Sequence, residues 1–469
     1  MRLFKLLGQK VGRHAPASWR REREQVQSDA LISPDEQKVD VFFLNLILGL
    51  IAIGLVMVYA SSVARAGRVN PLYHAQFFYK QLGSVFIGLS LMWVFSRLHH
   101  QIWRRAAGLL LLFGFGLLLL TILIGQKSHG ATRWLSFGSF RFQSSELIKF
   151  AWLNYIVASV TRSDMQIRKL GGKKILEWVI LLGILAVLLG LQPDLGSLLI
   201  CGGLFGGVLY LSGVRIIYFL SLIPLVGALG FVVSIYYKHP LRRLVEFYEG
   251  LTSEGGGSYN VRQALIGFGR GNWTGVGLGQ SHQKMDFLPE AHTDFIFDIY
   301  GEEFGFIGVF FLVSLYVIFL LRGFKIARSA RDPYAYLLCA GVTCFIAFQA
   351  IVNMCMAIGM LPTKGLTLPF ISYGGSSLFI TCCAVGIVLG ISRQRELGPF
   401  DDRICSTLER LPYWLTMMSP EQQKQSAETK LQLPKISGAL PPTAQLSRKN
   451  QSHMKGSASK YRSKKRGPR

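Results

Sequence analysis

The chain has 469 residues, of which 50% are hydrophobic and 16% are charged. Apolar runs of about 18 residues or more recur along most of it, and a run of that length crosses the hydrocarbon core of a bilayer as a helix. This composition excludes a soluble globular protein, and the fold class that it predicts is an all-α polytopic membrane protein.

The apolar runs predict about ten transmembrane helices, which follow a polar and flexible cytoplasmic tail, residues 1–40. Residues 41–395 form the transmembrane domain, and residues 396–469 form a basic, disordered cytoplasmic tail. A large extracytoplasmic loop, residues 238–294, separates spans seven and eight. Span eight is the least regular, because the acids in its first half favour a partly buried loop or a half-helix. The predicted spans are 41–61, 77–97, 107–125, 144–161, 175–192, 195–212, 215–237, 295–321, 334–359 and 370–392.

The net charge of +25 is distributed unevenly and predicts the orientation. Lys and Arg cluster in both tails and in alternate loops, so the positive-inside rule places these loops and both termini in the cytoplasm. A long polar stretch precedes the first span, which argues against a cleavable signal peptide. The basic end "KGSASKYRSKKRGPR" suggests either nucleic-acid binding or a tail that contacts anionic lipid. The second reading is favoured, and no nucleic-acid partner is predicted.

Seven cysteines are present, and each falls in a predicted span or in the cytoplasmic tail. Their positions predict no disulfide framework, and their spacing matches no metal site. No metal and no cofactor is inferred, although the sequence leaves a divalent cation possible.

Basic residues on the outer side disobey the charge asymmetry and are therefore the first candidate site. The outward segment "GATRWLSFGSFRFQSSELIKF" contains Arg133 and Arg141, and Lys149 lies inside the predicted span 144–161. An ionisable group in a span is costly unless it faces a partner or a polar cavity. Lys149 follows Glu146 by three residues, so a structural ion pair is one reading. The other is a cationic wall for an anionic ligand.

The outward loop 238–294 contains further polar candidates and is too long to be a simple turn. Its "GFGRGNWTGVGLG" does not have the spacing of a dinucleotide fingerprint, so glycines for tight turns are the preferred reading. Lys364, in a later outward segment, would contact either a partner protein or a headgroup. The candidate binding residues are Arg133, Arg141, Glu146, Lys149, Arg243, Gln263, Lys284, Glu290, His292 and Lys364.

Four acids recur every four residues where this loop meets the next span: Glu290, Asp294, Asp298 and Glu302. On a helix this spacing would align them along one face. Asp294 follows His292 at the apolar boundary, where it would either cap a helix or act as a general base.

Long ordered motifs give the chain a resemblance to a known family. They are "GATRWLSFGSFRFQSSELIK", "QPDLGS", "LRRLVEF", "RQALIGFGRGNWTGVGLGQSHQKMDFLPEAHTDFIF", "GEEFG" and "GMLPTKGLTLPFISYGGSS". Over about residues 41–395 the chain resembles the SEDS proteins (shape, elongation, division, sporulation), and it is closer to the division member than to the elongation member. Ser144 replaces the usual proline of the family, and Asp298 replaces a small apolar residue.

The resemblance implies a ten-helix peptidoglycan glycosyltransferase that polymerises lipid II on the outer face of the bacterial inner membrane, at the division septum. Asp294 is the implied base, and Arg141 and Lys149 are the implied pyrophosphate ligands. The implied partner is a class B penicillin-binding protein, the septal transpeptidase, together with other membrane proteins of division. Two alternatives stay open at this point: a lipid II flippase and a non-catalytic scaffold for division proteins.

Overall fold

The structure is a computed structural model that describes most of the membrane domain. The described residues are 39–66, 72–128, 131–137, 140–162, 172–213, 245, 247–250, 252, 258–285, 288, 292–330, 332–362 and 365–393. All of them belong to one compact unit, Met1–Arg410. The predicted span 215–237, most of both tails, and three candidate residues, Arg243, Glu290 and Lys364, lie outside the described residues.

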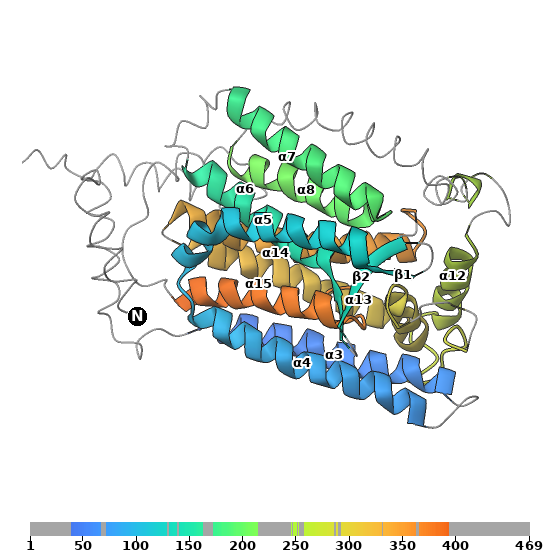
Figure 1. Cartoon of the computed structure of the whole chain (residues 1–469). Helices are drawn as coiled ribbons and strands as arrows, with labels where there is room; N and C mark the ends of the chain where they lie inside the picture. The colour runs from blue at the N-terminus through green and yellow to red at the C-terminus, as the bar shows by residue number, and fades with distance from the viewer. Residues whose placement is uncertain are drawn as a thin grey trace, which may run out of the picture. The chain divides into compact units, whose positions relative to one another are not determined.

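Nine described helices coincide with nine predicted spans and pack into a bundle (Figure 1). Six of them are long and apolar enough to cross a bilayer, namely α3, α4, α5, α13, α14 and α15. Helices α7 and α8 are apolar but shorter. The bounds are α3 Val41–Ala66, α4 Leu72–Arg97, α5 His100–Ile124, α6 Ser144–Arg162, α7 Gly172–Leu191, α8 Leu195–Leu211, α13 Ile296–Arg328, α14 Pro333–Ala357 and α15 Gly375–Arg393.

Burial places α14 and α15 at the centre of this bundle and α4 at its lipid-facing edge. The apolar window of α15 is 94% buried, against 22% for α4. Small residues allow the two to approach closely: Gly88 of α4 lies against Cys382, and Gly386 of α15 lies against the backbone of Met92. Lipid tails are as apolar as the helices, so the hydrophobic effect does not drive membrane helices together. Small residues let the helices approach closely, and the resulting van der Waals contact stabilises their packing.

A three-stranded antiparallel sheet connects α5 to α6, where the sequence predicted only an outward loop. Its strands are β1 (Gln126–Ser128), β2 (Ala131–Phe137) and β3 (Phe140–Gln143), in that order across the sheet. Strands β2 and β3 pair with Ser136 opposite Arg141. The purely α-helical prediction therefore missed a small sheet, which presents the two outward arginines from adjacent strands.

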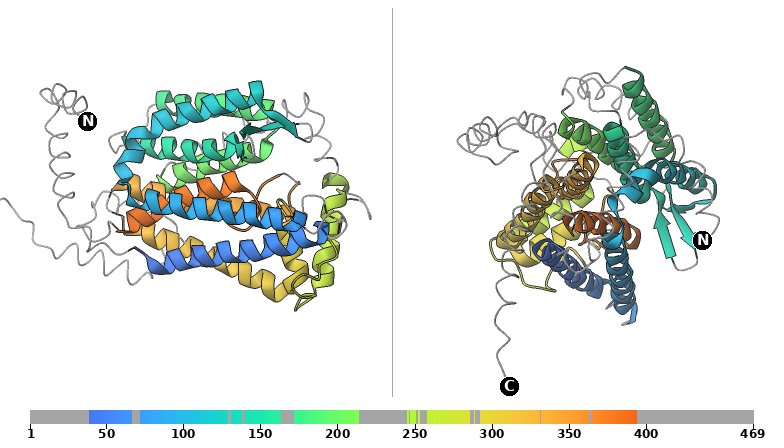
Figure 2. Two further views of the ribbon diagram at one scale, coloured as in Figure 1. Left: turned by 60° about the horizontal axis from the view of Figure 1, so that its bottom comes forward. Right: turned by 90° about the vertical axis from the view of Figure 1, so that its left-hand side faces the viewer.

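Helix α12 (Tyr259–Gly271) lies across the end of the bundle at which the sheet is found (Figures 1 and 2). The loop that follows α12 inserts into a break in α13 at Gly305, whose backbone is left-handed with φ 64°. Backbone N–H groups of Val276 and Gly277 donate to the carbonyls of Glu302 and Glu303 at 3.0 Å. In a membrane a broken helix persists only where its freed backbone groups find such partners. The expectation of a half-helix in span eight is confirmed.

Candidate active site

Asp294 lies in the turn that precedes α13, at the same end of the bundle as the sheet. It is half-buried, and its backbone carbonyl accepts a hydrogen bond from Nδ2 of Asn353 at 3.1 Å. Next to it, His292 packs edge-on against Phe77 with ring centroids 5.1 Å apart, and its carbonyl accepts from the backbone N–H of Tyr373 at 3.0 Å. The turn that carries Asp294 is therefore tied to α14, to α4 and to the segment before α15.

The structure excludes two of the arrangements that the sequence left open for Asp294. Helix α13 begins at Ile296, so Asp294 does not share a helical row with Asp298 and Glu302. The N-cap position belongs to Phe295, and its side chain makes no capping hydrogen bond. Asp294 therefore lies neither within α13 nor at its N-cap, and its carboxylate lies beside Gly365.

Asp294 and Arg133 both lie beside Gly365. A methyl group in place of the Gly365 hydrogen would lie 3.2 Å from Oδ2 of Asp294 and 3.7 Å from Nη1 of Arg133. Strand β2 supplies Arg133, and the loop before α13 supplies Asp294. The fold thus brings together a carboxylate and a guanidinium that the sequence placed in different outward segments.

The turn between α7 and α8 orients Arg133. The guanidinium donates to the carbonyl of Gln192 at 3.2 Å and also to the carbonyl of Pro193. Asp194, the next residue, accepts from Oγ of Ser197 at 2.8 Å. Burial alone would raise the pKa of Asp194, but the charge of Arg133 and the hydrogen bonds from serine lower it below its usual value. Asp194 therefore stays ionised and holds the turn beside a cation.

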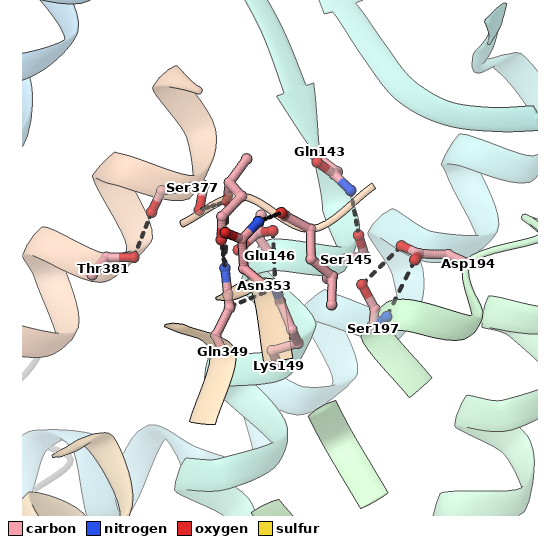
Figure 3. Close-up of polar contacts among 12 residues, drawn as sticks. Gln143, Ser145, Glu146, Lys149, Asp194, Ser197, Gln349, Asn353, Ser377 and Thr381 are labelled. Carbon is pink, nitrogen blue, oxygen red and sulfur yellow. Dashed lines mark hydrogen bonds and ion pairs between the residues drawn. The ribbon is translucent and has the colours of Figure 1, made fainter. Parts of the chain in front are cut away.

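Lys149 is fully buried in α6, and its Nζ donates to Oε1 of Glu146 at 2.9 Å and to Oε1 of Gln349 at 3.1 Å (Figure 3). The Glu146–Lys149 ion pair, one of the two readings of the sequence, is present in the structure. An ammonium group carries three donors, and these contacts account for two of them. The pair keeps the charge of Lys149 in the bundle interior, where an unpaired ammonium would be costly.

Two polar residues of α14 complete the site and were missed from the sequence. Gln349 and Asn353 are each 1% exposed and face the segment 365–367. Their signal was present, because two amides four residues apart interrupt the apolar run "AFQAIVNMC" on one helical face.

The remaining candidates occupy different surroundings. Arg141 is exposed on β3. Its charge acts on Tyr373: burial raises the pKa of this tyrosine, and the charge of Arg141 opposes the rise. Gln263 is half-buried in α12. Lys284 is buried and pairs with Glu303 at 2.8 Å. This contact supports a structural role for Lys284. To bind substrate as predicted, Lys284 would have to give up or share its pairing with Glu303.

The contacts of Glu302 and Glu303 explain why the sequence has these two acids near the start of span eight. Glu302 accepts from the hydroxyl of Ser281 and from the backbone N–H groups of His282 and Gln283, at 3.0 and 3.2 Å for the latter two. Together with the Lys284–Glu303 pair, these bonds fasten the loop after α12 to α13. Among the described residues, no group of three or more His, Cys, Asp or Glu side chains is placed to bind a metal.

The fold and this cluster of charges define a polytopic membrane protein with a carboxylate, a guanidinium and a buried ammonium at one end of its bundle. Residues 41–397 match the family of FtsW, RodA and SpoVE, described as "Cell cycle protein". The chain belongs to this family, which is the SEDS family that its motifs resemble.

Curated relatives are named probable peptidoglycan glycosyltransferase FtsW. That of Coxiella burnetii is 38% identical over 362 residues, which cover 76% of this chain and 97% of the relative. That of Haemophilus influenzae is 36% identical over 371 residues, with 78% and 93% covered. The crystal structure of the rod shape determining protein RodA of Thermus thermophilus is 26% identical, has a TM-score of 0.58, and matches 78% of this chain and all of RodA. A chain of a peptidoglycan synthase complex, also 26% identical, matches with a TM-score of 0.60 over 77% of this chain and 99% of its own length.

Proposed function

We propose that this chain is the peptidoglycan polymerase of cell division and that Asp294 is its general base. The observation that carries the base assignment is that Asp294 and Arg133 both border Gly365, because this places a proton acceptor and a cation at one end of the bundle. The relatives that cover most of the chain are named as peptidoglycan glycosyltransferases, which supports a polymerase over a flippase.

In the proposed reaction Asp294 takes the proton from the 4-hydroxyl of the GlcNAc of one lipid II. The resulting alkoxide attacks C1 of the MurNAc of a second, lipid-linked chain. A new glycosidic bond forms, the bond from C1 to the phosphate oxygen breaks, and undecaprenyl pyrophosphate leaves with the electron pair. Fixed positive charges that face a developing anion lower the barrier, and Arg133, Arg141 and Lys149 are the residues proposed to supply them.

The lipid substrate suits the position of the site. The bundle has helices long enough to cross a bilayer, so a polyprenyl chain would stay in lipid while its headgroup reaches the charged end. The donor carries its own high-energy pyrophosphate, and so the reaction needs no nucleotide. The proposed partner is a class B penicillin-binding protein that cross-links the strands, and the structural match to a peptidoglycan synthase complex supports such a partnership. The proposed location is the division septum, with both termini in the cytoplasm.

The test is polymerisation of lipid II by the chain co-purified with its transpeptidase, in the unmodified form and as Asp294→Asn. General base catalysis contributes about 10²–10⁴-fold to a rate, so Asp294→Asn is expected to lower the polymerisation rate by at least about 100-fold. Asp332→Asn makes the same chemical change at the opposite end, where Asp332 caps α14, and is expected to keep the rate. Full activity of Asp294→Asn would contradict the base assignment. Translocation of lipid II without polymer would establish the flippase instead.

A further inference from the structure

Helix α14 holds the carbonyl of Asp294 through one buried amide. Nδ2 of Asn353 donates to the carbonyl of Asp294 at 3.1 Å and to the carbonyl of Leu366 at 2.6 Å. A side-chain amide has two N–H donors in one rigid plane. Both carbonyls are therefore fixed with respect to each other, and the turn that carries Asp294 is fixed to the segment 365–367.

The second amide of α14 ties the same segment to Lys149. Nε2 of Gln349 donates to the carbonyl of Thr367 at 3.1 Å, and Oε1 of Gln349 accepts from Lys149 at 3.1 Å. Figure 3 shows Gln349 and Asn353 next to Lys149 and Glu146. Adjacent residues of one short segment, Leu366 and Thr367, are thus joined to Asp294 on one side and to Lys149 on the other.

The segment also lies beside the Asp294 carboxylate. Gly365 lies so close to Oδ2 of Asp294 that a methyl group there would be only 3.2 Å away. A shift of the segment would therefore move the carboxylate as well as the backbone of Asp294. Amides buried in a membrane helix are costly without partners, and both amides of α14 direct their N–H groups to this one place.

We propose that Asn353 is a positioning residue for the general base. It sets Asp294 against the segment 365–367 and, through that segment and Gln349, sets the separation of Asp294 from Lys149. The inference rests on the proposed function, because it assumes that Asp294 takes the proton. Asn353 acts through backbone carbonyls, so its loss should slow the chemical step without weakening the binding of lipid II.

The test uses Asn353→Leu in the chain co-purified with its transpeptidase. Leu has nearly the same volume and no donor, so the carbonyls of Asp294 and Leu366 lose their bond. Small displacements of a catalytic group cost up to about 100-fold in rate. We expect kcat to fall by about 10- to 100-fold, with the KM for lipid II unchanged, because a displaced base slows the proton transfer and not the binding of lipid II. Asn353→Ser keeps one donor, and its kcat is expected to lie between that of Asn353→Leu and that of the unmodified chain.

The matched control is Thr343→Val on the same helix. Thr343 is also fully buried, but its hydroxyl donates to the carbonyl of Cys339 within α14. This variant loses a buried hydrogen bond with no connection to Asp294, and it is expected to keep both kcat and KM. Rates are expressed per monodisperse protein, so that lost stability does not count as lost catalysis.

The outcomes separate the two proposals. An unchanged kcat for Asn353→Leu, or a raised KM at constant kcat, would overturn the positioning role while leaving the polymerase intact. If Asn353→Leu does not fold, Asn353→Ser decides by the same two criteria. Failure of the unmodified complex to make polymer, or full activity of Asp294→Asn, would instead overturn the proposed function.

Discussion

Asp298 and Glu302 lie one helical turn apart in α13 and are both fully buried, but their surroundings differ. Glu302 accepts three hydrogen bonds from the loop 281–283. Neither carboxyl oxygen of Asp298 has a hydrogen-bond partner within the described part of the chain. A buried polar group that lacks its partner costs about 1–3 kcal/mol. Asp298 therefore weakens the fold at its position, whereas Glu302 strengthens it.

Asp298→Ala is expected to raise the melting temperature of the detergent-solubilised protein, because it removes an unpaired buried carboxyl. The gain is about 1–3 kcal/mol, less the cost of the small cavity that Ala leaves. Glu302→Ala is the matched variant and is expected to lower the melting temperature, since it strands the N–H groups of His282 and Gln283. A loss of polymerisation in Asp298→Ala at unchanged stability would show instead that this carboxyl takes part in the reaction.

The helices could be predicted where the sequence contains a long continuous run of apolar residues. The apolar runs of α3 and α5 end close to where the prediction ends them, because hydropathy alone determines a span. The sheet was missed because its short strands follow an apolar helix and resemble a loop, and because "TRWLSF" lacks the strict alternation of polar and apolar residues that indicates a strand.

The site was predictable as a list of residues but not as an arrangement. The motifs indicated Asp294 and Lys149, yet the bonds that organise them join residues far apart in sequence. Lys149 and Gln349 are separated by 200 positions, and Asn353 and Asp294 by 59. No local pattern reveals such pairs, because they exist only after the helices have packed.

The break in α13 makes this helix depend on the loop that follows α12. A side chain at Gly305 would collide with the backbone of Gly271 and Gly275, and the residue holds φ 64°. On both sides of the break, backbone hydrogen bonds join α13 to the loop after α12. Before it, Glu302 and Glu303 accept from Val276 and Gly277; after it, Phe306 donates to Asn272 at 2.8 Å, and Ile307 donates to Trp273 at 3.1 Å. The loop and the helix therefore form one unit.

Gly305→Ala is expected to destabilise the protein by at least about 2 kcal/mol, since a non-glycine residue in this conformation costs about 1–3 kcal/mol even before the collision. The measurement is thermal unfolding in detergent. Gly183→Ala in α7 is the control, because a methyl group there meets nothing within 4 Å; Ala is the better helix former, so stability should stay or rise. Equal stability of the two variants would show that the break tolerates a side chain.

Polar clusters close both ends of the bundle, but only one end contains the candidate site. At the opposite end Arg322 binds Asp40 through two nitrogens at 3.0–3.2 Å, and the backbone N–H of Asp40 donates to Ser392. These contacts join α3, α13 and α15. Asp332 accepts from Gln101 at 2.7 Å in the same region. Burial would raise the pKa of Asp332, but His100 and Arg104 lower it below its usual value.

The two ends are therefore expected to respond differently to the loss of one charge. Asp40→Asn weakens a charge pair in which the Asp40 side chain is 1% exposed and that of Arg322 is 27% exposed; hydrogen bonds to charged groups contribute about 1.5–3 kcal/mol, and the expected cost is of this order. Because this pair lies far along the helices from Asp294, kcat per folded protein should not change. Arg133→Gln removes a cation beside Asp294 and should lower kcat per folded protein by about 10-fold or more. It also removes the hydrogen bonds that Arg133 donates to the turn between α7 and α8, so the melting temperature should fall as well. Thermal unfolding and lipid II polymerisation, measured on both variants, check this division. A fall in kcat for Asp40→Asn as large as that for Arg133→Gln would mean that the bundle transmits strain from one end to the other, and that stability and catalysis are coupled along its length.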